Sequence, residues 1–331
     1  MTPTTPKKRI LSGMRPTGSL HLGHLVGTLE NWVRLQDEYD CFFMVADWHA
    51  LMGEYEHPAS VATYSLENVI DWISYGIDPE RSTLFIQSRV PEHLELCMVF
   101  SCLTPLGWLE RCPTYKEQLR EVTTRDLNTY GFLGYPVLQA ADILVYKGNA
   151  VPVGEDQLPH LELTREIARR FNSLYGKNVF PEPAALLTKA ARLLGTDGRK
   201  MSKSYGNTIN LSDDPATIMK KIAGMITDPQ RIKLADKGHP DICGVFAYYS
   251  FFFPESTGEV RQWCESAGIG CTECKKRLGA RLVEKLAPYQ AKRRALENDR
   301  GAIEKILARG EEKASAAASA TMKEVKAVLG I

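Results

Sequence analysis

The chain has 331 residues, of which 44% are hydrophobic and 24% are charged, and its net charge is +1. This length is enough for two domains, each with a core of its own. The mixture of apolar and charged residues excludes a chain that is disordered as a whole.

The charge is unevenly distributed along the chain. Residues 271–331 hold 14 Lys and Arg but only 8 Asp and Glu, a net of +6, whereas residues 1–270 hold 27 against 32, a net of −5. A basic C-terminal end on a mildly acidic body favours contact with a polyanion. The alternative is that these charges cover a solvated helical surface.

Neither a secretory leader near Met1 nor an apolar stretch of the roughly 18 residues that a membrane span requires is found in the sequence. In a chain without an export signal, the eight cysteines are typical of reduced thiols or metal ligands rather than of a disulfide framework. We therefore expect a cytoplasmic protein that does not enter a membrane.

The first predicted elements are a buried strand, a turn rich in glycine and proline at residues 13–18, and an amphipathic helix that continues to Leu35. The start of such a helix presents free N–H groups and a partial positive charge, which suit phosphate. His21 and His24 lie at this start, and Gly23 between them leaves room for a base or a ribose. This pattern indicates a nucleotide site, although the chain has neither G-x-x-x-x-G-K-[ST] nor G-x-G-x-x-G.

Further along the chain, short apolar runs alternate with amphipathic segments. This alternation predicts parallel β-α-β units and a doubly wound sheet. From residue 213 onward the pattern is helical. The predicted strands are residues 41–47, 82–88 and 151–154, and the predicted helices are residues 61–76, 92–112, 135–146 and 161–174.

A second candidate nucleotide-binding segment is the string Lys-Met-Ser-Lys-Ser at residues 200–204, which follows a glycine-flanked loop. Lys200 and Lys203 are three residues apart with small hydroxyl residues nearby, so the loop can form a mobile cationic clamp. Such a clamp can neutralise a triphosphate while charge develops on the leaving pyrophosphate. For a generic basic pentamer the alternative is a solvated loop.

These two segments together resemble the H-x-G-H and K-M-S-K-S signatures of class I aminoacyl-tRNA synthetases, in the same order and at similar spacing. The resemblance implies that an amino-acid carboxylate attacks the α-phosphate of ATP and that the acyl group then moves to the 3′ end of a tRNA. In such a reaction the protein contributes positioning and charge stabilisation more than acid–base chemistry.

The amino acid is indicated by residues 135–144, which include Asp142, and by residues 151–157, which read Val-Pro-Val-Gly-Glu-Asp-Gln. These segments look like those of the tryptophanyl-tRNA synthetases, and the resemblance extends over nearly the whole chain. In that family the aspartate that matches Asp142 accepts the indole N–H. A hydrogen bond to a charged acceptor in an apolar pocket is worth roughly 1.5–3 kcal/mol. Phenylalanine would leave this acceptor unpaired, which can cost a factor of about 10⁴ to 10⁵.

The same resemblance implies which residues hold the substrates. The residues expected to line the tryptophan pocket are Leu11, His49, Tyr135, Gln139, Asp142, Val153 and Gln157, with Gln139 where other members carry methionine. The residues expected to bind ATP, with Mg²⁺, are Arg15, Thr17, Gly18, His21, Gly23, His24, Gly154, Glu155, Asp156, Lys200, Met201, Ser202, Lys203 and Ser204. Lys116 matches a family lysine that reaches the triphosphate. The groups expected to act in catalysis are Lys116, Lys200, Lys203, His21 and His24.

Four late cysteines form the pattern C-x20-C-x6-C-x2-C. They are Cys243, Cys264, Cys271 and Cys274. Four thiolates suit a tetrahedral metal site, and the spacing leaves zinc, a four-iron cluster and four unrelated buried thiols open. A subset of bacterial tryptophanyl-tRNA synthetases carries a similar set near the anticodon, so the resemblance implies a 4Fe–4S iron–sulfur cluster. The four earlier cysteines are expected in the core.

By this resemblance the chain is expected to be a tryptophan–tRNA ligase. The predicted fold is α/β, with a Rossmann-type doubly wound parallel sheet in a catalytic domain at residues 1–207 and an all-α anticodon-binding domain at residues 208–331. The expected partners are tryptophan, ATP, tRNA(Trp) and a second copy of the chain, which would pack against residues 92–112. The alternatives are a tyrosyl-tRNA synthetase, a non-charging paralogue that binds tryptophan or a partner protein, and a redox or regulatory protein that uses the cysteine set.

Overall fold

A computed structural model describes residues 7–113, 115–116, 119, 126–187 and 193–331 of the chain. The chain forms two compact units, each built from segments that are far apart in the sequence. The first unit consists of Met1–Gly18, Trp32–Ala190 and Asp299–Ile331, and the second consists of Ser19–Asn31 and Ala191–Asn298.

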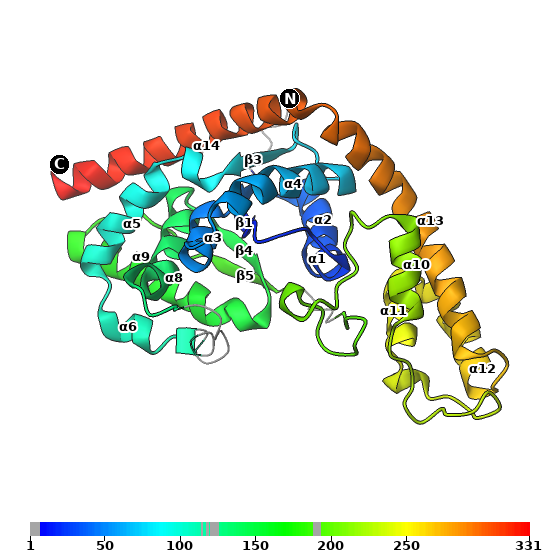
Figure 1. Cartoon of the computed structure of the whole chain (residues 1–331). Helices are drawn as coiled ribbons and strands as arrows, with labels where there is room; N and C mark the ends of the chain where they lie inside the picture. Colours follow the sequence, from blue (N-terminus) through cyan, green and yellow to red (C-terminus); the bar gives the residue numbers. More distant parts are fainter. Residues whose placement is uncertain (1–6, 114, 117–118, 120–125, 188–192) are drawn as a thin grey trace. The chain divides into compact units, whose positions relative to one another are not determined.

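A five-stranded parallel sheet forms the centre of the first unit (Figure 1). Its strands are β1 (Arg9–Met14), β2 (Asp40–Val45), β3 (Ser82–Ile86), β4 (Ala150–Val153) and β5 (Ala184–Leu187), in the order β3-β2-β1-β4-β5. β2 and β3 are almost continuously buried, and most of their residues are apolar, as expected for strands covered on both faces. The strand order reverses between β1 and β4, so the predicted doubly wound parallel sheet is confirmed.

Helices cover this sheet. They are α2 (Glu30–Glu38), α3 (Asp47–Glu54), α4 (Ala59–Tyr75), α5 (Glu92–Leu103), α6 (Leu106–Glu110), α8 (Tyr130–Val145), α9 (Leu158–Tyr175) and α14 (Arg300–Leu329), with the short turns η2 (Gln87–Arg89) and η3 (Glu155–Gln157). The predicted helix at residues 92–112 is divided into α5 and α6 at Pro105, which lacks the N–H that a continuous helix requires. Cys41 and Cys112 are buried as expected, but Cys102 is exposed, so its placement in the core was wrong.

The last helix, α14, packs against the edge strand β3 (Figure 1). A Cβ atom added to Gly310 would lie only 1.8 Å from the carbonyl oxygen of Leu84, so only glycine allows this approach. Arg89 forms ion pairs of 3.1 Å with both Glu304 and Glu311 of the helix. The helix therefore belongs to the packing of the sheet, which it reaches from the far end of the sequence.

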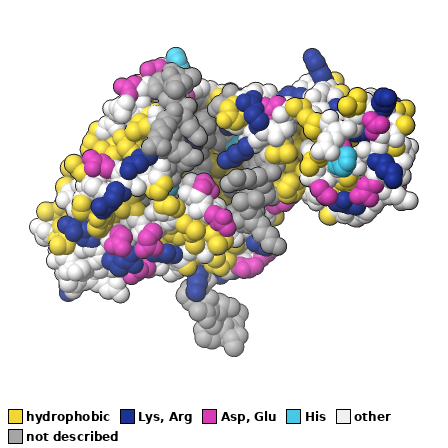
Figure 2. Space-filling view, turned by 90° about the horizontal axis from the view of Figure 1, so that it is seen from below, with side chains coloured by type: hydrophobic (Ala, Val, Ile, Leu, Met, Phe, Trp, Pro, Cys, Tyr) yellow, Lys and Arg dark blue, Asp and Glu magenta, His cyan; other side chains and the backbone are white. Residues whose placement is uncertain are grey.

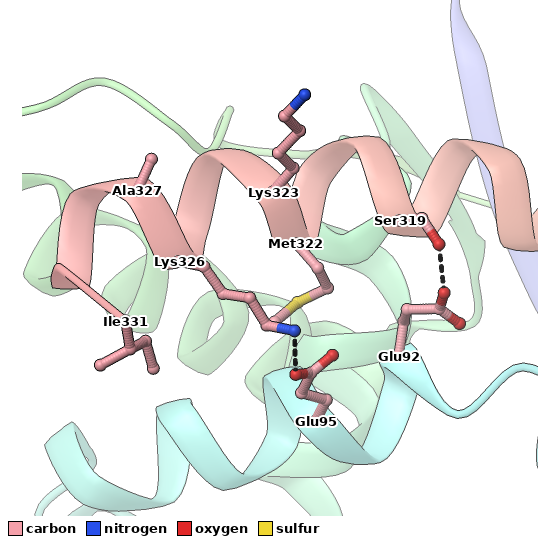
Figure 3. Close-up of a pocket in the computed structure, with 8 residues that line it drawn as sticks. All are labelled: Glu92, Glu95, Ser319, Met322, Lys323, Lys326, Ala327 and Ile331. Atoms are coloured by element: carbon pink, nitrogen blue, oxygen red, sulfur yellow. Dashed lines mark hydrogen bonds and ion pairs between the residues drawn. The ribbon is translucent and has the colours of Figure 1, made fainter.

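The C-terminal end of α14 and the helix α5 enclose a groove (Figure 3). Ser319 donates a hydrogen bond to Glu92, and Lys326 forms a 2.5 Å ion pair with Glu95 across it. Met322 lies between these two pairs and is buried. The groove contains no residue of the predicted substrate sites. Its two polar pairs attach the end of α14 to α5.

The second unit is largely helical. Its elements are α1 (Leu22–His24), the π-helical turn η1 (Leu25–Leu29), η4 (Lys203–Tyr205), α10 (Pro215–Ala223), η5 (Pro240–Ile242), α11 (Gly244–Phe252), η6 (Pro254–Ser256), α12 (Thr257–Glu265) and α13 (Cys271–Glu297). The first predicted helix is therefore interrupted by η1, a type of turn that is frequent at functional sites.

The boundary between these units differs from the predicted boundary at residue 207. Residues 299–331 pack with the sheet, and the H-x-G-H segment packs with residues 191–298. The predicted assignment of catalysis and anticodon binding to residues 1–207 and 208–331 concerns function and stays a prediction.

On the face shown in Figure 2, Lys and Arg side chains are interspersed with acidic and apolar ones. Contact of the basic C-terminal end with a polyanion stays a prediction. No helix in the described part of the chain is both long enough and apolar enough to cross a membrane.

Candidate active site

The two histidines of the H-x-G-H motif lie at the start of a short helix in the second unit. His21 caps α1: its Nδ1 accepts a hydrogen bond from the Gly23 N–H at 3.1 Å, and Nδ1 of His24 accepts one from the His21 N–H at 3.2 Å. A ring nitrogen that accepts carries no proton, so each neutral ring has its proton on Nε2. A Cβ on Gly23 would lie 2.9 Å from His21 Cε1, which explains the glycine.

Both rings are held in the uncharged form. Burial, followed by the charge of Lys203, lowers the pKa of His21 to about 4. Burial and the charges of His21 and Lys203 lower the pKa of His24 well below its usual value. At neutral pH the two imidazoles can donate hydrogen bonds but contribute no positive charge to this helix start.

The K-M-S-K-S loop lies beside this helix start, within the same unit. The Leu22 N–H donates to the carbonyl of Ile209 at 3.0 Å, which joins the segments that carry the two motifs. Lys203 is close enough for its charge to lower the pKa of both histidines. Met201 is only 5% exposed and anchors the loop, whereas Lys200 is exposed and Lys203 is half-buried. The structure thus brings the two predicted ATP signatures together.

A buried asparagine that sequence reasoning missed holds this loop. Asn207 accepts from the Ser202 N–H at 2.8 Å and donates to the Lys200 carbonyl at 3.1 Å and to the Asp197 carboxylate at 2.7 Å. The hydrogen bond from Asn207 is the largest cause that lowers the pKa of Asp197 to about 2. The Ser204 side chain lies outside the described part of the chain.

The remaining predicted ATP residues belong to the first unit, where they follow the carboxyl ends of two neighbouring strands. They are Arg15, Thr17 and Gly18 after β1, and Gly154, Glu155 and Asp156 after β4. The strand order reverses between β1 and β4, and ligands of doubly wound sheets bind at such a reversal. Gly18 has a φ of 129°, which other residues rarely adopt. Lys116 is exposed and also belongs to this unit.

The predicted tryptophan-pocket residues come from several elements of the first unit. They are Leu11 on β1, His49 on α3, Tyr135, Gln139 and Asp142 on α8, Val153 on β4 and Gln157 on η3. Leu11, Asp142 and Val153 are buried, and Gln139 is half-buried on α8, one turn before Asp142. A Tyr135–His160–Gln157 chain joins two of these residues: the Tyr135 hydroxyl lies 2.6 Å from His160 Nε2, and His160 Nδ1 lies 3.1 Å from Gln157 Oε1.

Asp142 is a buried carboxylate that accepts hydrogen bonds from three side chains. His49 Nε2 lies 2.8 Å from Oδ2, while Gln87 Nε2 and His93 Nδ1 lie 2.8 and 2.7 Å from Oδ1. Burial by itself would raise the pKa of this carboxyl group. The hydrogen bonds from His49 and His93 outweigh burial and lower the pKa to about 2. Asp142 therefore carries its charge at neutral pH inside an apolar core.

Comparisons with known proteins show the family to which the chain belongs. The family model for class I tRNA synthetases (W and Y) matches residues 4–287. A tryptophan–tRNA ligase from Thermotoga maritima is 50% identical, over 98% of this chain and 99% of that protein, and one from Ralstonia nicotianae is 43% identical, over 98% of each. A solved structure of tryptophanyl-tRNA synthetase from Campylobacter jejuni, complexed with ADP and tryptophan, is 32% identical with a TM-score of 0.89 and covers 98% of this chain and 100% of that one.

This chain belongs to the tryptophanyl-tRNA synthetases of class I. Its enzymatic activity is that of a tryptophan–tRNA ligase, an aminoacyl-tRNA synthetase. Many relatives at 42–50% identity are tryptophan–tRNA ligases, which favours tryptophan over the tyrosine alternative.

In this member of the tryptophanyl-tRNA synthetases, the four late cysteines line one cavity of the second unit together with Arg231 and mostly apolar side chains. They are Cys243, Cys264, Cys271 and Cys274. The Arg231 guanidinium donates to Cys271 Sγ at 3.8 Å. Burial and then the charges of the other three thiols raise the pKa of Cys274 to about 12. As placed, the described residues contain no group of three or more His, Cys, Asp or Glu that could hold a metal ion.

Four residues that the sequence analysis did not identify form hydrogen bonds to predicted site residues. Gln87 and His93 contact Asp142, His160 joins Tyr135 to Gln157, and Asn207 holds the lysine loop. All four are buried, and a buried polar side chain needs a hydrogen-bond partner, but burial is known only from the structure. Their partners lie up to 55 residues away in the sequence, so only the fold reveals the contacts.

Proposed function

We propose that the chain recognises tryptophan through Asp142, activates it with ATP and transfers it to tRNA(Trp). The observation that carries this proposal is the buried, ionised carboxylate on α8, only 2% exposed. A buried charge of this kind is costly unless its hydrogen bonds are made, so a side chain that brings an N–H is favoured over one that brings none. Such a site rejects an analogue without the donor by a factor of about 10⁴ to 10⁵.

In the proposed reaction an oxygen of the tryptophan carboxylate bonds to the α-phosphorus of ATP while the bond from that phosphorus to pyrophosphate breaks. The resulting acyl bond is then attacked by a terminal hydroxyl of the tRNA, which loses its proton and releases AMP. Neither step requires a protein acid or base, so positioning and neutralisation of charge are the contributions expected of the protein.

The charges of the described residues suit a protein that neutralises phosphate charge and supplies no acid or base. Lys200 and Lys203 neutralise the phosphates as negative charge moves onto the leaving pyrophosphate. His21 and His24, which stay uncharged at neutral pH, donate from Nε2 to phosphate or ribose oxygens. Lys116 supplies a further cation for the triphosphate. Mg²⁺ supplies additional charge neutralisation when it is bound with ATP.

The test is amino-acid-dependent exchange of pyrophosphate into ATP, with tryptophan, tyrosine and phenylalanine in parallel. We expect exchange with tryptophan alone, and we expect Asp142→Ala to abolish the preference over phenylalanine. Exchange with tyrosine alone would overturn the specificity, and no exchange with any of them would favour the non-charging paralogue.

We also propose that the cysteines lining the cavity hold a 4Fe–4S cluster. Four thiols that converge on one largely apolar cavity, with a guanidinium at its edge, supply the ligand number and the positive charge that such a cluster requires. When bound, the cluster would be held by Cys243, Cys264, Cys271 and Cys274, and we assign it no step of the reaction. Zinc is the alternative, because four thiolates suit it equally in number.

Anaerobic purification, followed by the visible absorption spectrum and by iron, sulfide and zinc analysis, tests this proposal. A brown protein with about four iron atoms per chain supports the cluster. A colourless protein with one zinc supports the alternative, and a metal-free protein leaves four thiols. Cys274→Ser should lower the metal content, whereas Cys102→Ser, at an exposed cysteine outside the cavity, should not.

A homodimer is proposed from an apolar row on α5 and α6. Leu94 and Met98, four residues apart on α5, are 40% and 65% exposed, and Leu106 on α6 is 62% exposed. Large apolar side chains exposed close together in the sequence are typical of an interface. Sedimentation should show a dimer that Met98→Glu weakens. The matched control is Leu174→Glu, at a residue on α9 that is 57% exposed. A monomeric parent protein would contradict the proposal.

The basic residues of the C-terminal end are proposed to contact tRNA(Trp). Because phosphate contacts release counterions, tRNA affinity should fall steeply as salt increases. An affinity that does not depend on salt would contradict this contact. A cytoplasmic location, which follows from the reduced cysteines and the substrate, is also a proposal.

A further inference from the structure

The donors around Asp142 are unequally divided between its two carboxylate oxygens. Oδ1 accepts from both Gln87 and His93, whereas His49 is the one donor to Oδ2 among the residues that the structure describes. A carboxylate oxygen has two lone pairs, so Oδ1 is saturated and Oδ2 keeps one free position. Gln87 and His93 are both 0% exposed, so water does not replace them easily. The His49 side chain is 12% exposed, which places Oδ2 on the more accessible side.

His93 joins Asp142 to a second residue of the same helix. Its Nδ1 faces Asp142 Oδ1 at 2.7 Å and its Nε2 faces the Tyr146 hydroxyl at 2.7 Å. An ionised carboxylate can only accept, so Nδ1 carries the proton, and in a neutral ring the Tyr146 hydroxyl must donate to Nε2. Asp142 and Tyr146 are four residues apart on α8, and His93 therefore clamps successive turns of that helix from α5.

Gln87 approaches the same oxygen from η2. Its Nε2 donates to Asp142 Oδ1, while its Oε1 is buried with no hydrogen-bond partner among the residues that the structure describes. The opposite orientation of the amide would place two acceptors against each other. An unpaired buried acceptor is unfavourable. The hydrogen bond from Gln87 Nε2 to Asp142 therefore has to compensate for the unpaired Oε1.

The backbone of η2 is itself fastened on two sides. The Ser88 N–H donates to Asp47 Oδ1 at 3.0 Å, and Asp47 is the first residue of α3, the helix that carries His49. On the other side, Arg89 pairs with two glutamates of α14. The position of Gln87 is therefore set by the framework of the first unit and not by a loop of its own.

We propose that His93 and Gln87 are positioning residues for tryptophan: they saturate Oδ1 of Asp142 and so make Oδ2 the oxygen that accepts the indole N–H. This inference rests on the proposed role of Asp142. Without the donor at Oδ1, the buried carboxylate would rotate or take up a proton, and a protonated oxygen would no longer accept the indole N–H. The loss would affect only substrates that bring this N–H.

Two substitutions of His93 separate its two hydrogen bonds. The side-chain nitrogen of asparagine takes the place of Nδ1, and that of glutamine takes the place of Nε2. His93→Asn therefore keeps a donor to Asp142 and loses the hydrogen bond to Tyr146. His93→Gln keeps a hydrogen-bond partner for Tyr146 and loses the donor to Asp142. Gln87→Met removes the other donor at similar shape, and His57→Gln, at an exposed position, is the matched control.

The measurement is kcat/KM in pyrophosphate exchange for tryptophan and for 3-benzothienylalanine, in which sulfur replaces the indole N–H. We expect the wild-type preference for tryptophan to fall about tenfold or more in His93→Gln and Gln87→Met, as for loss of one charge-assisted hydrogen bond. It should be kept in His93→Asn and His57→Gln, with KM for ATP unchanged in all four variants.

A role that is only structural would reduce exchange with both substrates equally and leave their ratio unchanged. That result in His93→Gln or Gln87→Met would overturn the inference while leaving the role of Asp142 intact. A wild-type enzyme that did not distinguish the two substrates would instead refute the role proposed for Asp142 itself. If His93→Gln fails to fold, Gln87→Met provides the same ratio independently.

Discussion

Asn207→Ala tests whether the order of the lysine loop limits activation. The substitution removes the three hydrogen bonds of the side chain, at 2.7, 2.8 and 3.1 Å. At ~0.5–1.5 kcal/mol each, their loss would cost about 2–4 kcal/mol. Water can reach Lys200 and replace part of this loss, so the lower value applies. A loss of about 2 kcal/mol corresponds to about a 30-fold change in the balance between the ordered and the open loop.

We expect kcat for tryptophan-dependent pyrophosphate exchange to fall by up to about 30-fold in Asn207→Ala, because Lys200 and Lys203 would be aligned in only a fraction of the molecules. KM for tryptophan should hardly change, since Asp142 belongs to the other unit.

The matched control is Asn172→Ala. Asn172 makes similar hydrogen bonds in the first unit, where it accepts from the Val179 and Phe180 N–H groups at 2.9 and 3.1 Å. Its loss should lower the melting temperature without a comparable loss of kcat. If Asn207→Ala kept kcat within about twofold of the parent value, or if both variants lost kcat equally, our account of the loop would be refuted.

Three further outcomes are expected. The pKa of His21 lies at about 4, below its usual 6.5, so the unfolded chain binds the proton more tightly and the free energy of unfolding should decrease as pH falls from about 6.5 to 4. Urea unfolding should show a smaller decrease for His21→Gln and the parental one for His57→Gln. Gly310→Ala should lower the free energy of unfolding by about 1–3 kcal/mol or more, because the added Cβ meets the carbonyl of Leu84. Gly258→Ala is the control and should not lower it, because its Cβ meets nothing within 4 Å. Equal melting temperatures of the two variants would contradict the packing of α14 on β3. Lys203→Ala should sharply reduce adenylate formation, and an unchanged rate would eliminate the proposed clamp.

Local sequence was sufficient for the strands β2 and β3. Residues 41–45 are apolar throughout, and residues 84–86 are Leu-Phe-Ile; apolar runs of this kind are stable only where both faces are covered. The two ATP signatures could also be found, because each is a short string whose residue types match the chemistry of phosphate. By contrast β5 (Ala184–Leu187) is a short strand whose residues are exposed or half-buried, and it carried no such signal.

The positions of helices that return from a distance could not be found locally. The basic, alanine-rich composition of α14 indicates a helix but not its partner. Only the tertiary structure shows that it packs on the sheet, where Gly310 lies close to the carbonyl of Leu84. For the four late cysteines, sequence and structure each supply a part. Their spacing predicts a shared site, and the tertiary structure places all four around one cavity.

The sequence by itself determined the class of the fold and the two short motifs, because each depends on residue type and short-range spacing. The resemblance to the tryptophanyl-tRNA synthetases pointed to Asp142 as the residue that we propose accepts the indole N–H. Only the tertiary structure decided how Asp142 is held. Its donors His49, Gln87 and His93 come from three elements, 93, 55 and 49 residues away in the chain. The energy of a buried charge depends on which donors reach each of its oxygens, and this is a property of packing that no local pattern records.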